Sequence, residues 1–176
     1  LLTLPRGGLL APLEEVEENW VKVALCDGRT GYTRGSLLSE FYSAPIDLPE
    51  EKLRARLVDT AMLYRGTPYR WGGKTPQGLD CSGLTSMVYL LSGIVIFRNS
   101  KLLRDFPIRP IPLNEAKPGD LVYFTGHIGL YLGEGRYLHV TGRMGSDGVT
   151  VNSLDPASPL FRADLRETVL TAGTYF

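Results

Sequence analysis

The sequence has little cysteine and histidine, no excess of charge of either sign and no long apolar run. It contains two cysteines and two histidines among 176 residues, too few for a disulfide framework. Lysine plus arginine and aspartate plus glutamate number 19 each, so no basic surface is expected to attract nucleic acid. The longest apolar candidate, residues 87–97, is interrupted at Ser92 and Gly93. A helix that spans a bilayer needs about 20 apolar residues, and we therefore expect no membrane span in this chain.

The composition is typical of a folded protein with many turns. Hydrophobic residues make up 43% of the chain, which also has 20 glycines and 12 prolines. A chain of this length accommodates a small domain followed by a medium-sized one. The segment from Ser43 to Pro49 is rich in proline, as linkers often are. We therefore expect one domain at residues 1–44 and a second at residues 45–176.

The first domain is predicted to be all β. Residues 9–16 and 20–25 have the composition of short strands, and Asp27-Gly28 favours a tight hairpin because both residue types tolerate positive φ. This pattern predicts a small β-barrel. At about 40 residues such a barrel is marginally stable alone, and it is expected to pack against the second domain.

The second domain is predicted to be α+β, with helices packed on an antiparallel sheet. A first helix is expected between the N-cap residue Asp47 and Gly66, because apolar residues recur there at helical spacing. A second helix is expected from Cys81 to Leu91, ended by Gly93. Four later segments alternate as antiparallel strands do, at residues 120–124, 127–132, 136–141 and 149–152.

Cys81 is the stronger candidate nucleophile of the two cysteines. It opens a predicted helix after a glycine-rich segment where a substrate backbone can approach. A helix N-terminus lowers the pKa of a thiol from its usual value of about 8.5. The alternative is that Cys81 is a buried structural residue, the commoner situation for an isolated cysteine. Cys26 fits that alternative, since it alternates with apolar neighbours in a predicted strand.

His127 and His139 lie on neighbouring predicted strands whose apolar residues must face the core. The two imidazoles share the opposite face only if the connection at residues 133–135 holds an odd number of loop residues, as in a three-residue hairpin with a bulge at Gly135. Two imidazoles placed in this way can act as a base for a thiol and as the group that orients the base.

Cys81, His127 and His139 can also be read as zinc ligands, because thiolate and neutral imidazole both bind zinc. A fourth ligand and the carboxylates that usually support metal-bound histidines have no marker in the sequence. We therefore favour the catalytic interpretation, and we expect neither a metal nor another cofactor.

Five sequence blocks resemble the signature of the NlpC/P60 cell-wall cysteine peptidases: GTPYRWGG at 66–73, GLDCSG at 78–83, KPGDL at 117–121, HIGLYLG at 127–133 and YLH at 137–139. In addition, LPRGG at 4–8, WVKVAL at 20–25 and DGRTGY at 27–32 resemble a bacterial SH3-like domain. The first resemblance implies a papain-like catalytic domain. It also implies hydrolysis of the bond between D-glutamate and a diamino acid in peptidoglycan peptides.

The resemblance assigns catalytic roles position by position. Cys81 matches the family nucleophile, His127 the base and His139 the third polar residue. Tyr69 matches a tyrosine whose hydroxyl faces the catalytic site and assists the oxyanion. From the residue alone, the alternative is that Tyr69 is a core side chain.

The resemblance also implies a substrate-binding set. Asp80 and Ser82 match positions that bind the free amino group of an L-Ala-D-Glu substrate in members preceded by SH3-like domains, and Trp71 lines the same cleft. The family usually has Pro-Arg and small hydroxyl residues after the nucleophile helix, where this chain has FRNS at 97–100, and Ser100 is matched to the substrate position. Without the resemblance, Asp80 is a helix N-cap and Trp71 a core residue.

Together these matches predict an endopeptidase that cuts the γ-D-glutamyl to diamino acid bond of murein peptides with a free N-terminal L-alanine, in cell-wall peptide recycling. The SH3-like domain is expected to form a wall of the cleft. The alternatives are an inactive wall-binding module and a thiol amidase or acyltransferase that acts on another amide.

We expect a monomer whose partner is a muropeptide. The chain begins at Leu1 without a methionine, so a signal peptide or lipid anchor can have been removed. A bacterial location in the cytoplasm or in the cell envelope therefore stays open.

Overall fold

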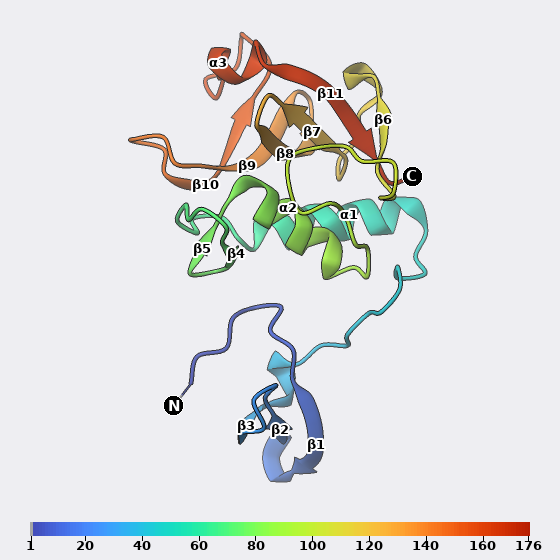
Figure 1. The fold of residues 1–176 in the computed structure, drawn as a ribbon, viewed down its shortest axis with the longest axis vertical. Coiled ribbons are helices and arrows are strands. Elements are labelled where there is room, and N and C mark those ends of the chain that lie inside the picture. Colours follow the sequence, from blue (N-terminus) through green and yellow to red (C-terminus); the bar gives the residue numbers. More distant parts are fainter. Residues whose placement is uncertain (1) are drawn as a thin grey trace.

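A computed structural model describes residues 2–176, so the first position of the predicted 1–44 domain, Leu1, lies outside the described residues. The chain forms two parts, a small sheet near the N-terminus and a larger α+β body, joined by an extended segment (Figure 1). No helix in residues 2–176 is long and apolar enough to cross a membrane.

The N-terminal part is an antiparallel sheet in the order β1-β2-β3. Its strands are β1 (Ala11–Val16), β2 (Trp20–Ala24) and β3 (Thr30–Arg34), with short 3-10 turns η1 (Glu17–Asn19) and η2 (Gly35–Leu37). The predicted hairpin is confirmed: it joins β2 and β3, and Gly28 has a φ of 83°.

The predicted barrel is not closed within residues 2–176, because the strand order of this sheet leaves β1 and β3 as its two edges. Every residue of β1 is exposed, and Val23 of β2 is buried. Three short strands with so little buried apolar surface cannot wrap around a core. The assignment of this segment to the SH3-like class stays a prediction, as does the domain division at residue 44.

The linker is fixed to the larger body where the helix α2 (Cys81–Leu90) ends. The backbone N–H of Ile46 donates to the carbonyl of Ser92 at 3.1 Å. Gly93 has a φ of 75°, and a Cβ there would lie 1.9 Å from the Ala44 carbonyl oxygen. Glycine is therefore required at residue 93 both by its backbone conformation and by the close approach of the linker.

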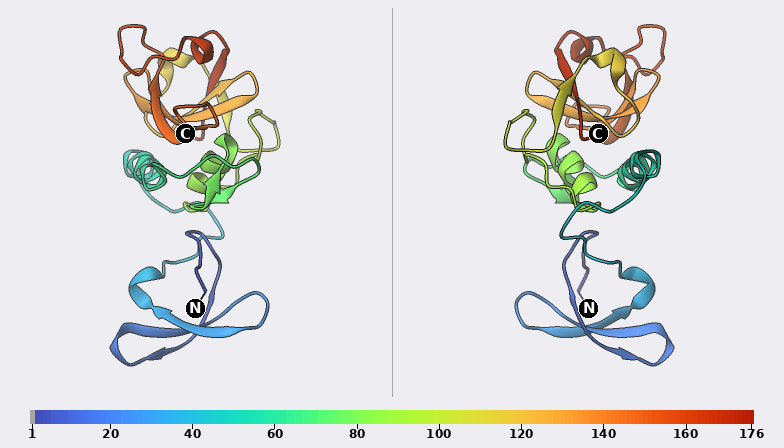
Figure 2. Two further views of the ribbon diagram at one scale, coloured as in Figure 1. Left: turned by 90° about the vertical axis from the view of Figure 1, so that its left-hand side faces the viewer. Right: turned by 90° about the vertical axis from the view of Figure 1, so that its right-hand side faces the viewer.

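The larger body packs α2 and α1 (Glu50–Met62) against one face of a six-stranded sheet (Figures 1 and 2). The order of the strands is β10-β9-β8-β7-β11-β6. Their bounds are β6 Arg109–Ile111, β7 Leu121–Phe124, β8 His127–Gly133, β9 Arg136–Thr141, β10 Gly148–Ser153 and β11 Val169–Thr174. The remaining elements are β4 Lys74–Thr75, β5 Gly78–Leu79, η3 Leu113–Glu115 and α3 Ala163–Arg166. This arrangement confirms the predicted α+β class of the domain.

Helix α1 begins differently from the sequence prediction. Its N-cap is Pro49, which makes no side-chain cap hydrogen bond, so the prediction of Asp47 as the cap was wrong. Glu50 and Glu51 occupy the first turn, where negative charge is stabilised by the helix dipole. The helix ends at Met62, three turn residues follow, and Gly66 comes next with a φ of 79°.

The sheet is buried on both faces. One apolar cluster lies between the helices and the sheet, and a second cluster of Val122, Phe124, Tyr137 and Leu154 lies on the other face. All four residues of β7 are consequently buried. A strand that is covered on both faces has a continuous apolar sequence, as β7 has with LVYF.

Candidate active site

Cys81 is the first residue of α2. Asp80 is the N-cap, and its side chain accepts a hydrogen bond from the backbone N–H of Gly83 at 2.6 Å, which confirms the capping interpretation. A Cβ on Gly83 would lie 2.0 Å from the carbonyl oxygen of Gly73. The glycine-rich segment therefore packs directly against the first turn of the helix and leaves the Cys81 side chain partly exposed.

The environment of the Cys81 thiol differs from the sequence prediction, which was a lowered pKa. Burial raises the pKa of Cys81, and the negative charge of Asp80 raises it further, although the backbone N–H groups of Ile128 and of the helix N-terminus act in the opposite direction. Loss of hydration of a thiolate outweighs the stabilisation by nearby N–H groups in this site. Since Ile128 follows His127 directly, the contact brings the thiol to the beginning of β8.

The two histidines form one chain of hydrogen bonds with a third residue. Nε2 of His127 lies 2.7 Å from Nδ1 of His139, with the two rings at 89° to each other. Nε2 of His139 in turn lies 2.8 Å from Oδ1 of Asn152 in β10. The predicted contact between the two imidazoles is confirmed, whereas Asn152 was missed.

Both imidazoles are neutral at physiological pH. Burial lowers the pKa of His127 to about 3, with further contributions from His139 and Arg162. Burial also lowers the pKa of His139 to about 4, and the hydrogen bond with Asn152 opposes this shift. A neutral imidazole has one donor nitrogen and one acceptor nitrogen. Each ring can therefore donate one hydrogen bond and accept one in this series.

The β8–β9 hairpin shows how the histidines reach a common face. Leu130 pairs with Leu138, and an irregularity after Tyr131 shifts the register by one residue before the turn. The turn residues Glu134 and Gly135 have φ values of 54° and 72°, as a two-residue hairpin turn requires. The predicted bulge at Gly135 was therefore wrong in position, but the irregularity near Leu132 supplies the extra residue that the prediction required.

Tyr69 lies beside the thiol. Burial raises the pKa of the Tyr69 hydroxyl, and the charges of Cys81 and Asp80 add to this effect. The ring is held from the other side by Gly142 in the β9–β10 connection, where a Cβ would lie 3.0 Å from a ring carbon. The position of this connection therefore bears directly on the position of the tyrosine.

The Asp80 carboxylate accepts further hydrogen bonds besides the one that caps α2. Arg98 donates to both carboxylate oxygens at 3.0 Å each, and it also donates to Oγ of Ser82 at 2.7 Å. The N–H of Gly72 donates to the second oxygen at 2.8 Å. Burial alone would raise the pKa of Asp80, but the Arg98 guanidinium and the two backbone donors hold it below its usual value.

Trp71 and Ser100 lie in the loops that precede and follow α2 in the chain. Trp71 is 86% exposed, so the core interpretation of this tryptophan was wrong and its ring is free to contact a ligand. Ser100 is half-buried, two residues beyond Arg98. Arg98 itself was not assigned a role from the sequence, although it follows the apolar Phe97 at the point where the family has its Pro-Arg pair.

The two ring nitrogens that face each other are not arranged as a pair of metal ligands. Within residues 2–176 no group of three histidine, cysteine, aspartate or glutamate side chains is placed to hold a metal ion. Nε2 of His127 and Nδ1 of His139 lie 2.7 Å apart and face each other. In this hydrogen bond one nitrogen carries the hydrogen and the other accepts it with its lone pair, so neither of the two has a lone pair directed at a metal.

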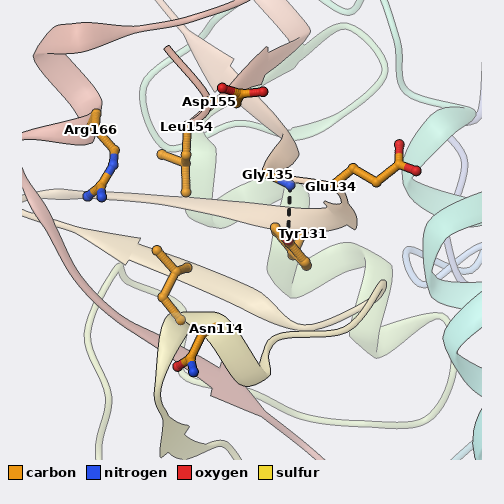
Figure 3. A pocket seen from close by; sticks show the side chains of 8 residues that line it. Asn114, Tyr131, Glu134, Gly135, Leu154, Asp155 and Arg166 are labelled. Carbon is orange, nitrogen blue, oxygen red and sulfur yellow. Dashed lines mark hydrogen bonds between the residues drawn. The ribbon is translucent and has the colours of Figure 1, made fainter. Parts of the chain in front are cut away.

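A surface hollow of about 690 Å³ lies elsewhere on the body (Figure 3). Its lining comes from η3, the β8–β9 hairpin, the start of the loop after β10 and the end of α3. The Tyr131 hydroxyl in this lining accepts a hydrogen bond from the N–H of Gly135 at 3.0 Å. None of the site residues predicted from the sequence lines it. The chemistry described above is thus separate from this hollow.

Comparison with known proteins identifies several that are similar to this chain in sequence or in fold. A protein of Lysinibacillus sphaericus named dipeptidyl-peptidase 6 is 42% identical over 179 residues, which cover 100% of this chain and 65% of that protein. The NlpC/p60 domain of the peptidoglycan hydrolase SagA has a TM-score of 0.54 at 32% identity, over 69% of this chain and 97% of that structure. An NlpC/P60 family protein from Bacillus cereus has a similar fold, with a TM-score of 0.74 at 24% identity, over 94% of this chain and 53% of that one.

The family model of NlpC/P60 matches residues 66–160. This range is more than half of the 176 residues, and it contains Cys81, His127, His139 and Asn152. It excludes the N-terminal sheet and α1. By this match, the chain belongs to the NlpC/P60 family.

Proposed function

We propose that the protein is a cysteine peptidase that hydrolyses amide bonds in peptidoglycan-derived peptides. The observation that carries the proposal is the thiol of Cys81 at a helix N-terminus, next to a strand whose first residue, His127, begins a chain of hydrogen-bonded polar groups. Two relatives support the class by name, since one is called a dipeptidyl-peptidase and another a peptidoglycan hydrolase.

In the proposed reaction the Cys81 sulfur attacks the amide carbonyl carbon while His127 accepts the thiol proton. The carbon–nitrogen bond then breaks, and His127 returns the proton to the leaving amine. Water then adds to the thioester and gives a proton to His127. The carbon–sulfur bond breaks, His127 returns the proton to sulfur, and the acid product leaves the restored thiol. His139 orients His127 throughout, and the hydroxyl of Tyr69 donates a hydrogen bond to the developing oxyanion.

The resting pair is neutral in this proposal. The pKa of Cys81 is raised and that of His127 is lowered to about 3, so a preformed thiolate–imidazolium pair is not favoured before the substrate arrives. Proton transfer accompanies attack on the carbonyl, as in general base catalysis. The pH profile of the reaction then reports a coupled pair of groups.

For the substrate, we propose the γ-D-glutamyl to diamino acid bond in short murein peptides with a free N-terminal L-alanine, in cell-wall peptide recycling. Trp71, Ser82 and Ser100 are proposed to contact the peptide, with Asp80 and Arg98 as the charged pair of the site. That the N-terminal part forms a wall of the cleft stays a prediction; its turn around Gly7 approaches Met87 and Leu91, in the C-terminal half of α2. Cys81 lies at the opposite end of that helix, roughly 10–15 Å away.

The test is product analysis by mass spectrometry with L-Ala-γ-D-Glu-diamino acid peptides. We expect L-Ala-D-Glu and the released diamino acid fragment, with no products from Cys81→Ala. The Cys26→Ala variant is the matched control and is expected to retain activity. Cys26 is an exposed turn residue, so the expectation that it is buried in a strand was wrong.

Three results would contradict parts of the proposal. Activity of Cys81→Ala equal to wild type would exclude the thiol mechanism. Transfer of the acyl group to added amines in place of hydrolysis would favour the acyltransferase alternative. Binding of these peptides without any turnover would favour an inactive binding module.

A further inference from the structure

The chain of hydrogen bonds that begins at His127 does not end at His139. Oδ1 of Asn152 lies 2.8 Å from Nε2 of His139, and Nδ2 of Asn152 donates to the backbone carbonyl of Leu160 at 3.0 Å. Nδ2 of Asn152 joins this series of hydrogen bonds to the loop between β10 and α3. The series of hydrogen bonds therefore begins at His127, beside the thiol, and ends at the Leu160 carbonyl.

A backbone carbonyl is an acceptor and never a donor. Because the Leu160 carbonyl can only accept, Asn152 must direct its NH₂ group toward this carbonyl and its oxygen toward His139. The Asn152 oxygen is also an acceptor only, so Nε2 of His139 must carry a hydrogen. In the neutral ring this leaves Nδ1 of His139 as an acceptor, at 2.7 Å from Nε2 of His127.

The same reasoning extends one ring further. Nε2 of His127 faces an acceptor and must carry a hydrogen, so the free lone pair of neutral His127 is on Nδ1. We propose that Asn152, held by the Leu160 carbonyl, is a positioning residue that sets the tautomers of both histidines and so makes Nδ1 of His127 the base. This inference rests on the proposed function for its catalytic consequence, but the tautomers themselves can be measured without a substrate.

The loop that supplies Leu160 is anchored independently of Asn152. The N–H of Ser153 donates to the Leu160 carbonyl at 2.9 Å, and the N–H of Arg162 donates to the Ser153 carbonyl at 3.2 Å. Removing the Asn152 side chain thus leaves the backbone contacts between the loop and β10 in place. A change in the histidines of such a variant can be separated from collapse of the loop.

The charged groups around His139 define what a negative charge at residue 152 would do. Arg162 lowers the pKa of His139, Asp164 raises it, and the neighbouring rings are those of His127 and Tyr137. An aspartate in place of Asn152 would favour a second proton on His139. Nδ1 of His139 would then donate to His127, and His127 would have to place its own hydrogen on Nδ1, where it cannot accept the thiol proton.

The experiment uses the whole chain labelled with ¹⁵N-histidine, because the sequence has two histidines and gives two imidazole spectra. Wild type is expected to show both rings as neutral Nε2–H tautomers at pH 7. Asn152→Ala is expected to populate the Nδ1–H form of His139 and to lower kcat about tenfold with KM nearly unchanged, equivalent to about 1.4 kcal/mol. Asn152→Asp is expected to move the acid limb of the kcat/KM profile upward by about one pH unit or more.

The exposed Asn114 supplies matched controls, since Asn114→Ala and Asn114→Asp make the same changes at a residue outside this series of hydrogen bonds. Neither control is expected to alter the tautomers or the pH profile. Unchanged tautomers in Asn152→Ala would overturn the inference, whatever happens to activity. Identical pH profiles for Asn152→Ala and Asn152→Asp would overturn it as well, because a purely structural residue would not distinguish the two. An enzyme that cleaves no peptide but shows the expected tautomers would contradict the proposed function and leave the role of Asn152 supported.

Discussion

The ion pair between Arg98 and Asp80 offers a quantitative test of how the first turn of α2 is held. Arg98→Met removes the guanidinium while keeping a side chain of similar reach. Asp80 would keep its hydrogen bonds from Gly72 and Gly83, but it would lose the positive charge that faces both of its oxygens. The carboxylate, whose side chain is 11% exposed, cannot recover full hydration in exchange.

The expected magnitude follows from the burial of the pair. Removing one partner of a fully buried ion pair costs about 3–5 kcal/mol, and an exposed pair is worth about 0–1 kcal/mol. Arg98 is 28% exposed, so solvent screening reduces the upper figure and we expect a loss of about 2 kcal/mol. Arg136→Met is the matched control, because its 2.8 Å pair with Glu134 has side chains that are 48% and 84% exposed.

The loss of unfolding free energy caused by Arg98→Met should decrease as the pH falls. The pKa of Asp80 is lowered in the folded protein, so its contribution to stability is present above the unfolded pKa of about 4 and disappears as pH falls through the folded pKa. Urea unfolding at pH 7 and at about pH 3 measures this difference. The reasoning is refuted if Arg98→Met costs no more than Arg136→Met at pH 7, or if its cost increases on acidification.

Three further outcomes are expected. The rate of iodoacetamide labelling of Cys81 should reach its half-maximum above the usual pKa of a thiol, and a half-maximum below pH 7 would reveal a preformed ion pair. Gly142→Ala should displace the Tyr69 ring, lower kcat and reduce the free energy of unfolding by about 1 kcal/mol. Gly31→Ala is the control, because a Cβ there meets no atom within 4 Å, and it should change neither quantity. Equal kcat values for the two variants would argue against a role for the Tyr69 position. Acetylation of the substrate L-alanine should lower kcat/KM at least tenfold if the Asp80 side of the site receives its ammonium group, and equal rates on both peptides would show that no such contact exists.

Much of the catalytic body could be predicted because local patterns and tertiary requirements agree there. Asp80 before Cys81 predicts a helix N-terminus, and the alternation along β8 and β9 predicts a shared face for His127 and His139. These features depend on residues close together in the sequence, or on the simple two-residue period of a strand. The class of fold followed from the same periodicities.

Other features depend on contacts between distant segments, which periodicity does not encode. Arg98 reaches Asp80 across 18 positions in sequence, and Asn152 receives its role from Leu160 in an irregular loop. A signal for Asn152 did exist, because a polar residue at the end of β10 shares a face with Thr150, which pairs with His139. The lowered thiol pKa was mispredicted because the extent of desolvation around Cys81 is a property of the packed site, and the helix N-terminus alone does not decide it.

The order of strands in the larger sheet has a consequence for how the protein is made. Strand β11 lies between β7 and β6, yet it follows Cys81, His127 and His139 in the chain. During synthesis, at about 5–20 residues per second, all three of these residues leave the ribosome before the strand that joins β6 to the rest of the sheet. The nascent chain therefore carries its reactive groups on an incomplete sheet until β11 is inserted, and this delay separates the appearance of the thiol from the assembly of a rigid site around it.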